Sequence, residues 1–409
     1  MKTTYRLKVV QATQDIPKEE WNALATDETV PFVKWDWLAG LEESKSLGPN
    51  TGWHPLHITL WRGSELAAVA PLYLRTSSRG DYVFDNFWAE AAESLNRHWY
   101  PKLVGTSPVT PAEGYRFLVA PDLDSQETSH ILLDAAEGLC RKNNIPGIHL
   151  LFADPQWSSI LPAQGYSAWE HNHYLWENTG YADFDEFLGI FNKNQRKNIR
   201  KEYRHHLEQG LTIKFVPGEE AGKEHFAEMF NLFTITNDKH YPWDFRFINK
   251  KFFQYMEKNM RENTAFVEAR RTAAPKPTIL SDALTGDYLI RDREVGEIVA
   301  MAFFVRKKDR LWGRYWGTYQ DVPDLHFAVC YYTPIEWAIQ NGIRYFEPGT
   351  GGSHKTRRGF RTVYNSSYHK FLDPVLTRLF TQNVDDLNRY EEANRVAVNR
   401  GLPFKKEFI

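Results

Sequence analysis

Residues 344–360 read RYFEPGTGGSHKTRRGF, and this stretch decides both the fold class and the candidate site. A short run of strand type ends at the carboxylate of Glu347. Three glycines, which let a backbone turn tightly and approach a ligand, come next: Gly349, Gly351 and Gly352. Four basic residues complete the stretch: His354, Lys355, Arg357 and Arg358. Such a loop is usually only a solvated connection, but here it follows a strand end, where α/β folds place their sites.

The composition indicates a globular chain with more than one domain. With 409 residues it is too long for one ordinary core, so two domains are expected. A net charge of −2 draws it neither to DNA nor to an anionic membrane. The start has no apolar core of signal-peptide length, and no window approaches a membrane span. Cys140 and Cys330 form no recognisable motif. We therefore predict a cytoplasmic protein with reduced thiols.

The order of the expected elements predicts an α/β (α+β) fold, because runs of strand and helix periodicity alternate along the chain. Strands are expected over 57–61, 66–74, 81–88, 147–152, 211–216, 264–269, 298–305, 311–316, 343–347 and 367–372. Helices are expected over 16–25, 31–42, 129–143, 183–207, 225–238, 247–260 and 326–340, with a polar helix at the end. A hairpin should join the first two strands, and Pro334 should kink its helix or mark a boundary.

We predict two domains, over residues 1–165 and 166–409. The two halves have a similar order of elements without a residue-level repeat. Proline and charge near 270–293 interrupt a pair of strands, which is typical of a surface insertion.

The helix expected over 183–207 carries a basic cluster that only Glu202 opposes. Its members are Lys193, Arg196, Lys197, Arg200, Lys201 and Arg204. A charge run is usually a solvated face. This helix also has an apolar stripe that docks it and holds the cations in place, so a phosphate-binding face is an equal alternative. Lys197, Arg200 and Arg204 are the anion-binding candidates.

The connection from Gly313 to His326 is a second candidate region, because the N-terminus of a helix attracts phosphate. Asp321 and Asp324 would repel phosphate or cap the helix. The alternative for His326 is a capping or packing role. The further candidates for donor or anion binding are Arg314, His326, Gly351, Gly352 and Arg358.

Aromatic residues mixed with polar ones are the acceptor-binding candidates. They are Trp35, Asp85, Tyr100, Lys102, His173 and Trp176. The alternative for all six is a place in a core or at its rim. His171 and His173 would share one face of a strand, but no third ligand stands nearby, so we predict no metal site.

Short motifs spread over nearly the whole chain are shared with a known family. They are PFVKWDWL at 31–38, APLYL at 70–74, DYVFD at 81–85, YPKL at 100–103, KNIRKE at 197–202, GRYWG at 313–317, LHF at 325–327, CYY at 330–332, and FEPG at 346–349 with HKTRRGF at 354–360. With these motifs the sequence resembles the Fem-like family of peptidoglycan biosynthesis or recognition proteins, within the GNAT acyltransferase superfamily.

The resemblance implies two tandem GNAT-like domains, each a mixed central sheet flanked by helices. The first would take the acceptor and the second the donor, with the loop 349–360 opening into a cleft between them.

Fem-type transferases move an aminoacyl group from charged tRNA to an amine of a peptidoglycan precursor. An aromatic–lysine pair lies at their reacting centre. The pair here is His354–Lys355, with His in place of the usual Phe. The relatives closest to this pattern usually carry Gln and Glu where this chain has Gly351 and Ser353, and the pyrophosphate-loop glycines of acetyl-CoA-dependent enzymes are not visible before His326.

The leading hypothesis is an N-acyltransferase that forms an amide on a small-molecule or peptide amine. Its catalytic candidates are Lys355, Glu347 and His354. Lys355 would stabilise the oxyanion, and Glu347 or the substrate's own carboxylate would take the amine proton. Acyl-CoA or aminoacyl-tRNA is the candidate donor, so tRNA is a candidate partner, and no permanently bound cofactor is expected.

The alternatives are a non-catalytic module that binds a cell-wall precursor or peptide, and a structural protein. The oligomeric state does not follow from the sequence.

Overall fold

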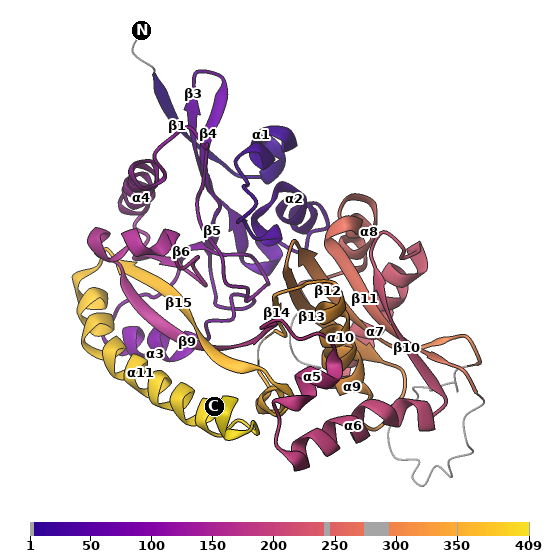
Figure 1. Ribbon diagram of the computed structural model, residues 1–409. Coiled ribbons are helices and arrows are strands. Elements are labelled where there is room, and N and C mark those ends of the chain that lie inside the picture. Colours follow the sequence, from indigo (N-terminus) through magenta and orange to yellow (C-terminus); the bar gives the residue numbers. More distant parts are fainter. Residues whose placement is uncertain (1–3, 241–245, 274–293, 350, 409) are drawn as a thin grey trace. The chain divides into compact units, whose positions relative to one another are not determined.

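Helices and strands of the chain assemble into two units, each built on a mixed sheet flanked by helices (Figure 1). This computed structural model describes residues 4–240, 246–273, 294–349 and 351–408. The first unit comprises the residues up to His173 together with Phe247–Phe252 and Val363–Val396. The second comprises the described residues of Tyr174–Arg246, Phe253–Thr362 and the end of the chain from Ala397. The predicted α/β class with mixed sheets is confirmed.

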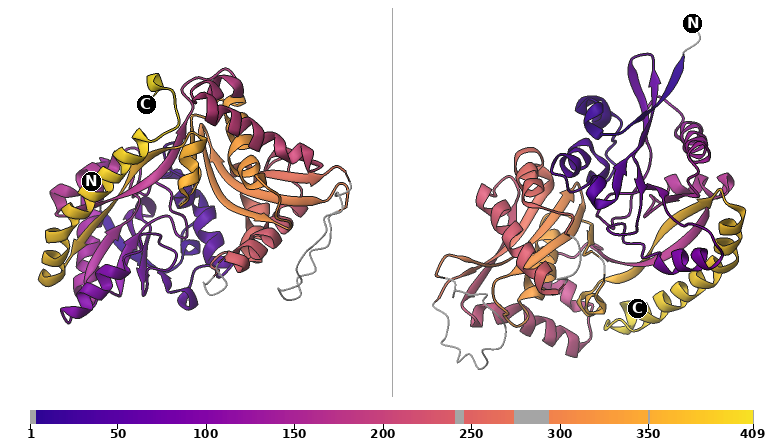
Figure 2. Two further views of the ribbon diagram at one scale, coloured as in Figure 1. Left: turned by 90° about the horizontal axis from the view of Figure 1, so that it is seen from below. Right: turned by 180° about the vertical axis from the view of Figure 1, so that it is seen from behind.

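The division between the units differs from the predicted one at 165/166, because the chain changes unit inside two strands. These strands are β9 (Ser167–Glu177) and β15 (Arg361–Phe371). The end of β15 pairs with β8 (Gly147–Leu150), and α11 (Pro374–Arg400) then runs along β9 (Figure 2). Asn388 of α11 fixes this docking, since its amide exchanges hydrogen bonds of 2.9 and 3.0 Å with the backbone of β9. The order of elements does not reveal such a return of the chain.

The first unit contains a four-stranded antiparallel sheet and a second, mixed sheet. The four strands are, in order, β1 (Tyr5–Val10), β3 (His57–Arg62), β4 (Glu65–Ala70) and β7 (Leu118–Val119). The mixed sheet continues from β15 and β8 to β6 (Lys102–Gly105), β5 (Leu72–Arg75) and β2 (Trp53–Pro55). Its helices besides α11 are α1 (Lys18–Ala23), α2 (Trp35–Glu43), α3 (Asn86–Ser94) and α4 (Ser125–Lys142). The predicted hairpin is confirmed as β3 and β4.

The predicted strand over 81–88 is wrong, because this segment turns and then enters α3. Tyr82 and Phe84 have left-handed backbone conformations, with φ of 61° and 53°. Asp81 and Asp85 both reach the ammonium of Lys102, at 3.0 and 2.6 Å. In an extended strand these two positions would stand about 13 Å apart. One ammonium could not bridge that distance, so the buried ion pairs require the turn.

The second unit is built on a sheet with one parallel pair. Its strands are, in order, β10 (Leu211–Pro217), β11 (Thr264–Arg271), β12 (Ile298–Lys307), β13 (Arg310–Thr318), β14 (Tyr345–Glu347) and the end of β9. Its helices are α5 (Phe184–Gly189), α6 (Lys193–Glu208), α7 (Lys223–His240), α8 (Lys250–Asn259), α9 (Leu325–Phe327) and α10 (Thr333–Gln340). β13 and β14 run parallel, whereas β10–β11, β11–β12, β12–β13 and β14–β9 are antiparallel pairs. The predicted insertion near 270–293 falls between β11 and β12, and residues 274–293 lie outside the described part.

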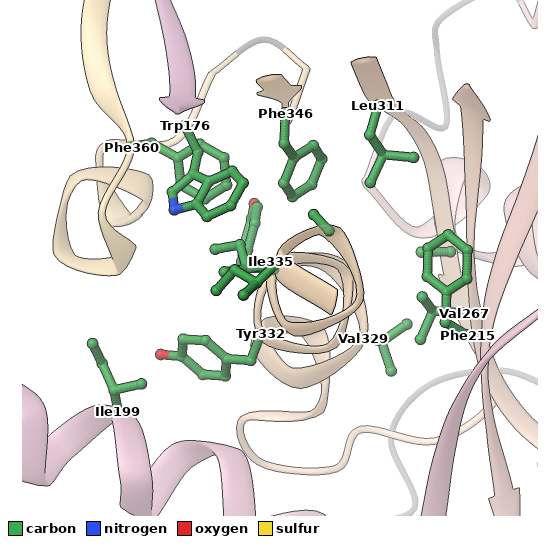
Figure 3. Close-up of a cluster of buried hydrophobic side chains, with 14 of the residues drawn as sticks. Trp176, Ile199, Phe215, Val267, Leu311, Val329, Tyr332, Ile335, Phe346 and Phe360 are labelled. Carbon is green, nitrogen blue, oxygen red and sulfur yellow. The ribbon is translucent and has the colours of Figure 1, made fainter. Parts of the chain in front are cut away.

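Apolar side chains hold the helical segment that leads into α10 at the centre of the second unit (Figure 3). Tyr332 extends from this segment on the side of Ile199 in α6, and Val329 on the side of Phe215 in the sheet (Figure 3). All four are buried or nearly so. The segment therefore packs against α6 and against the sheet at once, which fixes the residues that it carries.

The same segment changes its helical type at the predicted position. After α9 the chain makes a π-helical turn over Ala328–Tyr332, and α10 begins at Thr333 with Pro334 in its first turn. Proline lacks the backbone N–H that an α-helix needs in its interior, but the first turn of a helix tolerates it. The predicted boundary at Pro334 is confirmed.

Candidate functional site

The site begins where two neighbouring strands of the second unit stop pairing. β13 and β14 pair only over Arg310–Trp312 and Tyr345–Glu347, and β13 then continues to Thr318. On its other edge β13 carries one extra residue, because Phe303 faces Tyr315 while Phe304 faces Gly313. This β-bulge is at Arg314. Bulges turn a side chain in a new direction and are frequent beside active sites.

A cavity of about 310 Å³ lies at this place. Its walls come from β12 and β13, from the helical segment after β13, from the loop after Glu347 and from the short helix Ser353–Arg358. The lining residues are Ala302, Phe303, Phe304, Gly313, Arg314, Tyr315, Trp316, His326, Cys330, Tyr331, Pro348, Gly351, Gly352, His354 and Lys355. The structure thus brings together around one cavity several of the predicted site residues, which lie up to 41 positions apart between Arg314 and Lys355.

Arg314 and Glu347 form a buried ion pair beside the cavity. A guanidinium nitrogen of Arg314 donates to a carboxylate oxygen of Glu347 at 3.0 Å, and both side chains are almost inaccessible to water. Glu347 itself does not line the cavity. Glu347 therefore fits the role of orienting Arg314 better than the predicted role of taking a proton.

Lys355 lines the cavity but is not an open, exposed side chain. The residue is 2% exposed, and its ammonium donates to the carbonyl oxygen of Gly349 at 2.7 Å, within the same unit. Lys355 is therefore a buried residue of the second unit rather than an open one. Burial lowers the pKa of Lys355 to about 8, against the attraction of the Glu347 carboxylate. A cation that burial has largely removed from water interacts strongly with a negative charge that forms beside it.

His354 stands on the same short helix as Lys355 and packs among aromatic rings. Its ring lies 5.7 Å from that of His326, and its Nε2 is 2.9 Å from the hydroxyl of Tyr331. Burial and the nearby positive charges lower the pKa of His354 to about 4 and that of His326 to about 3. Both imidazoles are therefore neutral at pH 7.

Arg358 and Glu202 join this region to α6. Arg358 donates to the carboxylate of Glu202 at 2.7 Å and to the carbonyl of His354 at 2.8 Å, and its guanidinium lies 3.2 Å from the ring centre of Phe327. Gln195 of α6 also donates to the carbonyl of Arg357 at 2.7 Å. Arg358 is thus a structural clamp rather than a residue of the cavity wall, although the sequence predicted anion binding for it.

Residues 12–406 match the sequence pattern of one known family, which is described as peptidoglycan biosynthesis/recognition. The chain belongs to the FemAB-like family. The structure is similar to that of FemX, with a TM-score of 0.52 and 13% identity over 91% of this chain and 99% of FemX. The predicted resemblance and the fold that it implied are confirmed.

Two further solved structures are similar to this FemAB-like chain at lower scores. One is a tandem GNAT protein from the clavulanic acid biosynthesis pathway, with a TM-score of 0.43 and 10% identity over 91% of this chain and 99% of that one. The other is the C-terminal domain of a putative lysylphosphatidylglycerol synthetase from Agrobacterium fabrum, with a TM-score of 0.48 and 11% identity over 90% and 96%. No curated protein matches the sequence.

Three of the acceptor candidates of this FemAB-like chain meet in the interior of the first unit. The ammonium of Lys102 pairs with Asp85 at 2.6 Å, and the same carboxylate group accepts from the hydroxyl of Tyr100 at 2.7 Å. Asp81 completes the ionic cluster. Burial by itself lowers the pKa of Lys102, but the two carboxylates more than offset it, so the pKa is raised. Lys102 and Asp85 are too deeply buried to contact a ligand, which corrects their predicted role. The cluster instead holds the turn over 81–85.

The other acceptor candidates are also tied into the protein. The indole N–H of Trp35 donates to the carbonyls of Thr13 and Ile16 at 3.1 and 2.9 Å. Trp176 is 1% exposed in the core of the second unit, and His173 is buried as well. For Trp176 this burial excludes contact with an acceptor, because a core residue cannot reach a ligand without unfolding. In the sequence, aromatic residues mixed with polar ones form the same pattern whether they belong to a core or to a ligand site, so the pattern did not distinguish the two.

The basic face of α6 is exposed, as both of its interpretations required. Lys197, Arg200 and Arg204 are accessible to water, and Arg200 pairs with Asp185 at 2.8 Å. Glu202 and Gln195 form hydrogen bonds with the short helix Ser353–Arg358, part of which lines the cavity, and these bonds hold α6 against it. The phosphate-binding role of these cations stays a prediction.

Sequence reasoning missed part of the cavity wall. Tyr331 and the aromatic pair Tyr315 and Trp316 line it, although no role was predicted for them. The motifs CYY and GRYWG contained them. The signal available was the place of Tyr315 and Trp316 inside a predicted strand and of Tyr331 inside a predicted helix with a proline. Among the described residues, no group of three or more His, Cys, Asp and Glu side chains is arranged to hold a metal, and none of their helices is both long and apolar enough to cross a membrane.

Stability should fall at acidic pH, because several histidines are buried in the neutral form. The Nδ1 atoms of His149 and His369 lie 2.7 Å apart, and burial holds the pKa of both well below the ordinary value. Burial alone lowers the pKa of His171 to about 3. Below pH 6.5 the unfolded chain takes up protons that the folded chain refuses, so folding weakens by about 1.4 kcal/mol per pH unit for each such histidine.

Urea unfolding at pH 7.5 and at pH 5.5 measures this dependence. His171→Phe should reduce the loss of stability between these two conditions by about 1.4 kcal/mol. The exposed His98 provides the matched control, and His98→Phe should leave the loss unchanged. A protein that is as stable at pH 5.5 as at pH 7.5 would show that these imidazoles are charged in the folded state.

Proposed function

We propose that this FemAB-like chain is an N-acyltransferase that joins an acyl or aminoacyl group to an amine of a cell-wall precursor. In this reaction the amine nitrogen attacks the acyl carbonyl, a C–N bond forms, and the C–O or C–S bond to the donor's carrier breaks. The observation that carries the proposal is the position of Lys355 in the wall of the cavity between β13 and the loop after β14. The family description supports the cell-wall connection.

The proposed role of Lys355 is to stabilise the oxyanion of the tetrahedral intermediate. Its ammonium is already held by the carbonyl of Gly349, so it needs little reorganisation when negative charge appears. With a pKa of about 8, most Lys355 side chains are charged at pH 7. Arg314 adds positive potential and is oriented by Glu347.

The size of the cavity limits what enters it. At about 310 Å³ it is at the lower end of the range for small-molecule sites, so it takes an acyl or aminoacyl group rather than a whole carrier. The carrier, which is acyl-CoA or aminoacyl-tRNA in this proposal, must then remain outside. The accessible cations of α6 are the candidates that hold its phosphates. No resident cofactor enters the proposal, and the cytoplasmic location stays a prediction.

Mass spectrometry tests the proposed reaction. The purified full-length chain is incubated with acetyl-CoA or with a pool of aminoacylated tRNA, and with a nucleotide-linked muramyl pentapeptide that contains lysine. The expected result is a pentapeptide whose mass has increased by one acyl or aminoacyl group. Saturable binding of the pentapeptide without product would instead identify a binding module. Neither binding nor product would contradict both.

If α6 binds the phosphates of the donor, the affinity should fall steeply with salt. Three phosphate contacts release counterions, so the affinity for tRNA should decrease at least about tenfold between 50 and 200 mM salt. Neutralising Lys197, Arg200 and Arg204 together should weaken binding and flatten this dependence. Titration of labelled tRNA at both salt concentrations measures the effect. Arg389→Gln on the exposed face of α11 is the matched control, and an equal effect there would point to non-specific attraction.

A further inference from the structure

Two side chains on one wall of the cavity have no part in the reaction as proposed so far. The hydroxyl of Tyr331 lies 2.9 Å from Nε2 of His354, and both residues line the cavity. This distance is that of a good hydrogen bond. A hydroxyl and an imidazole in contact are a pair that can move a proton along the bond between them.

Unusual backbone features surround both members of this pair. Tyr331 lies in the π-helical turn Ala328–Tyr332, and single π-turns inside helices are rare and frequently occur at functional sites. The ring of His354 fills space that only glycine leaves, because a Cβ atom on Gly352 would lie 2.3 Å from it. Arg358 also donates a hydrogen bond to the carbonyl of His354. The pair is therefore placed by the fold rather than by chance.

The surroundings of His354 keep its imidazole neutral. The charged side chains that face it are Lys355 and Arg358 on its own helix, and the titratable ones are His326 on α9 and Tyr331 on the π-turn. The two cations disfavour a third positive charge. In the tautomer that carries its proton on Nδ1, a neutral imidazole accepts the hydrogen bond of this hydroxyl at Nε2.

We infer that Tyr331 and His354 form a proton relay that takes the proton which the attacking amine loses. As the C–N bond forms, the amine proton passes to the oxygen of Tyr331, and the hydroxyl proton of Tyr331 passes to Nε2 of His354. When the bond to the carrier breaks, the proton returns through Tyr331 to the oxygen or sulfur of the leaving group. No oxidant or further reactant is needed. This inference rests on the proposed function and makes both residues catalytic.

The relay also supplies an acceptor for the amine proton in place of Glu347. Glu347 is held by Arg314 and does not line the cavity, so the amine proton needs another acceptor. Burial and the two neighbouring cations keep His354 neutral, and the negative charge that develops on the acyl oxygen beside Lys355 offsets part of their effect. The imidazole thus becomes a better base at the moment when the proton must move.

Nitrogen NMR of the full-length protein tests the starting state without any substrate. His354→Gln identifies the signals of His354 in protein labelled at histidine nitrogens. The inference expects a neutral His354 at pH 7, with the proton on Nδ1 and a shift of Nε2 in Tyr331→Phe. A proton on Nε2 of His354 at pH 7 would overturn it, since the relay then has no acceptor.

Transfer kinetics test the proton step itself, with the mass-spectrometric assay of the pentapeptide. Tyr331→Phe and His354→Gln should each lower kcat on the order of a hundredfold, and the double variant should be no worse than the slower single one, because the two groups act as a unit. Glutamine can accept the hydrogen bond of Tyr331 but cannot take its proton. Near-normal transfer by His354→Gln would therefore assign His354 a structural role and overturn the relay.

The controls separate the relay from the proposed function. Tyr364→Phe and His98→Phe change the same residue types away from the cavity, and each should keep kcat within about twofold of the wild type. Transfer by the wild type together with normal rates in both relay variants would overturn the relay alone. Absence of transfer by the wild type with both donors would overturn the proposed function and the relay with it.

Discussion

Replacing Lys355 by methionine should lower the rate of acyl transfer about a hundredfold. The buried ammonium lines the cavity, and burial lowers its pKa to about 8. Because it is largely removed from water, it interacts strongly with a negative charge that forms beside it. Loss of one preorganised charge at an oxyanion costs about 3 kcal/mol of transition-state stabilisation. Methionine keeps most of the volume of the lysine side chain, which limits the change in packing. The rate is measured under saturating pentapeptide, so that binding and chemistry are separated.

A lysine far from the cavity provides the comparison for this experiment. Lys214 lies on β10 with a side chain that is 67% exposed, and Lys214→Met should leave the rate unchanged. Thermal unfolding of Lys355→Met shows whether the loss of its bond to Gly349 disturbs the fold. If the variant transfers the acyl group at the rate of the wild type, Lys355 has no part in the chemistry.

Lys102→Met should destabilise the first unit by about 3–5 kcal/mol. The substitution removes the ammonium that the buried carboxylates of Asp81 and Asp85 both contact, and leaves them close together without it. Removing one partner of a buried ion pair costs this much because the remaining charge stays desolvated. Urea unfolding at pH 7 measures the change. Activity per folded molecule should stay near that of the wild type if the cluster is structural.

A solvent-exposed ion pair serves as the control for Lys102. Lys239 and Asp321 are 2.7 Å apart, with side chains 56% and 81% exposed. Breaking such a pair typically costs at most about 1 kcal/mol, so Lys239→Met should hardly change the unfolding transition. Equal losses in both variants would show that the buried cluster contributes nothing beyond an ordinary surface pair.

The motifs of the sequence were sufficient to predict the loop that forms the cavity. Gly351, Gly352, His354 and Lys355 are neighbours in the chain, so their proximity follows from connectivity alone. Arg314 lies in the strand predicted over 311–316 and His326 begins the helix predicted over 326–340, and periodicity revealed both elements. The parallel pairing of β13 with β14 then placed these residues beside that loop.

Burial was the property that the sequence did not reveal. Trp176 and Lys102 have the composition of binding residues, yet one belongs to a core and the other to an internal ion cluster. Asp81 and Asp85 stood in the strand predicted over 81–88, whereas in the structure both of them contact Lys102. Each outcome depends on which distant segment covers the residue, and a run of ten residues contains no information on that.

By itself, the sequence determined the α/β class, the Fem-like family and the glycine-rich loop with its cations. These follow from local periodicity, from backbone freedom at glycine and from motifs within short windows. Only the tertiary structure decided that Glu347 pairs with Arg314, that Lys355 is buried, and that Tyr331 meets His354 across 23 positions of the chain. The reason is physical: proton affinity and ion pairing depend on the dielectric and the partners that packing supplies, and packing joins segments which the sequence keeps apart.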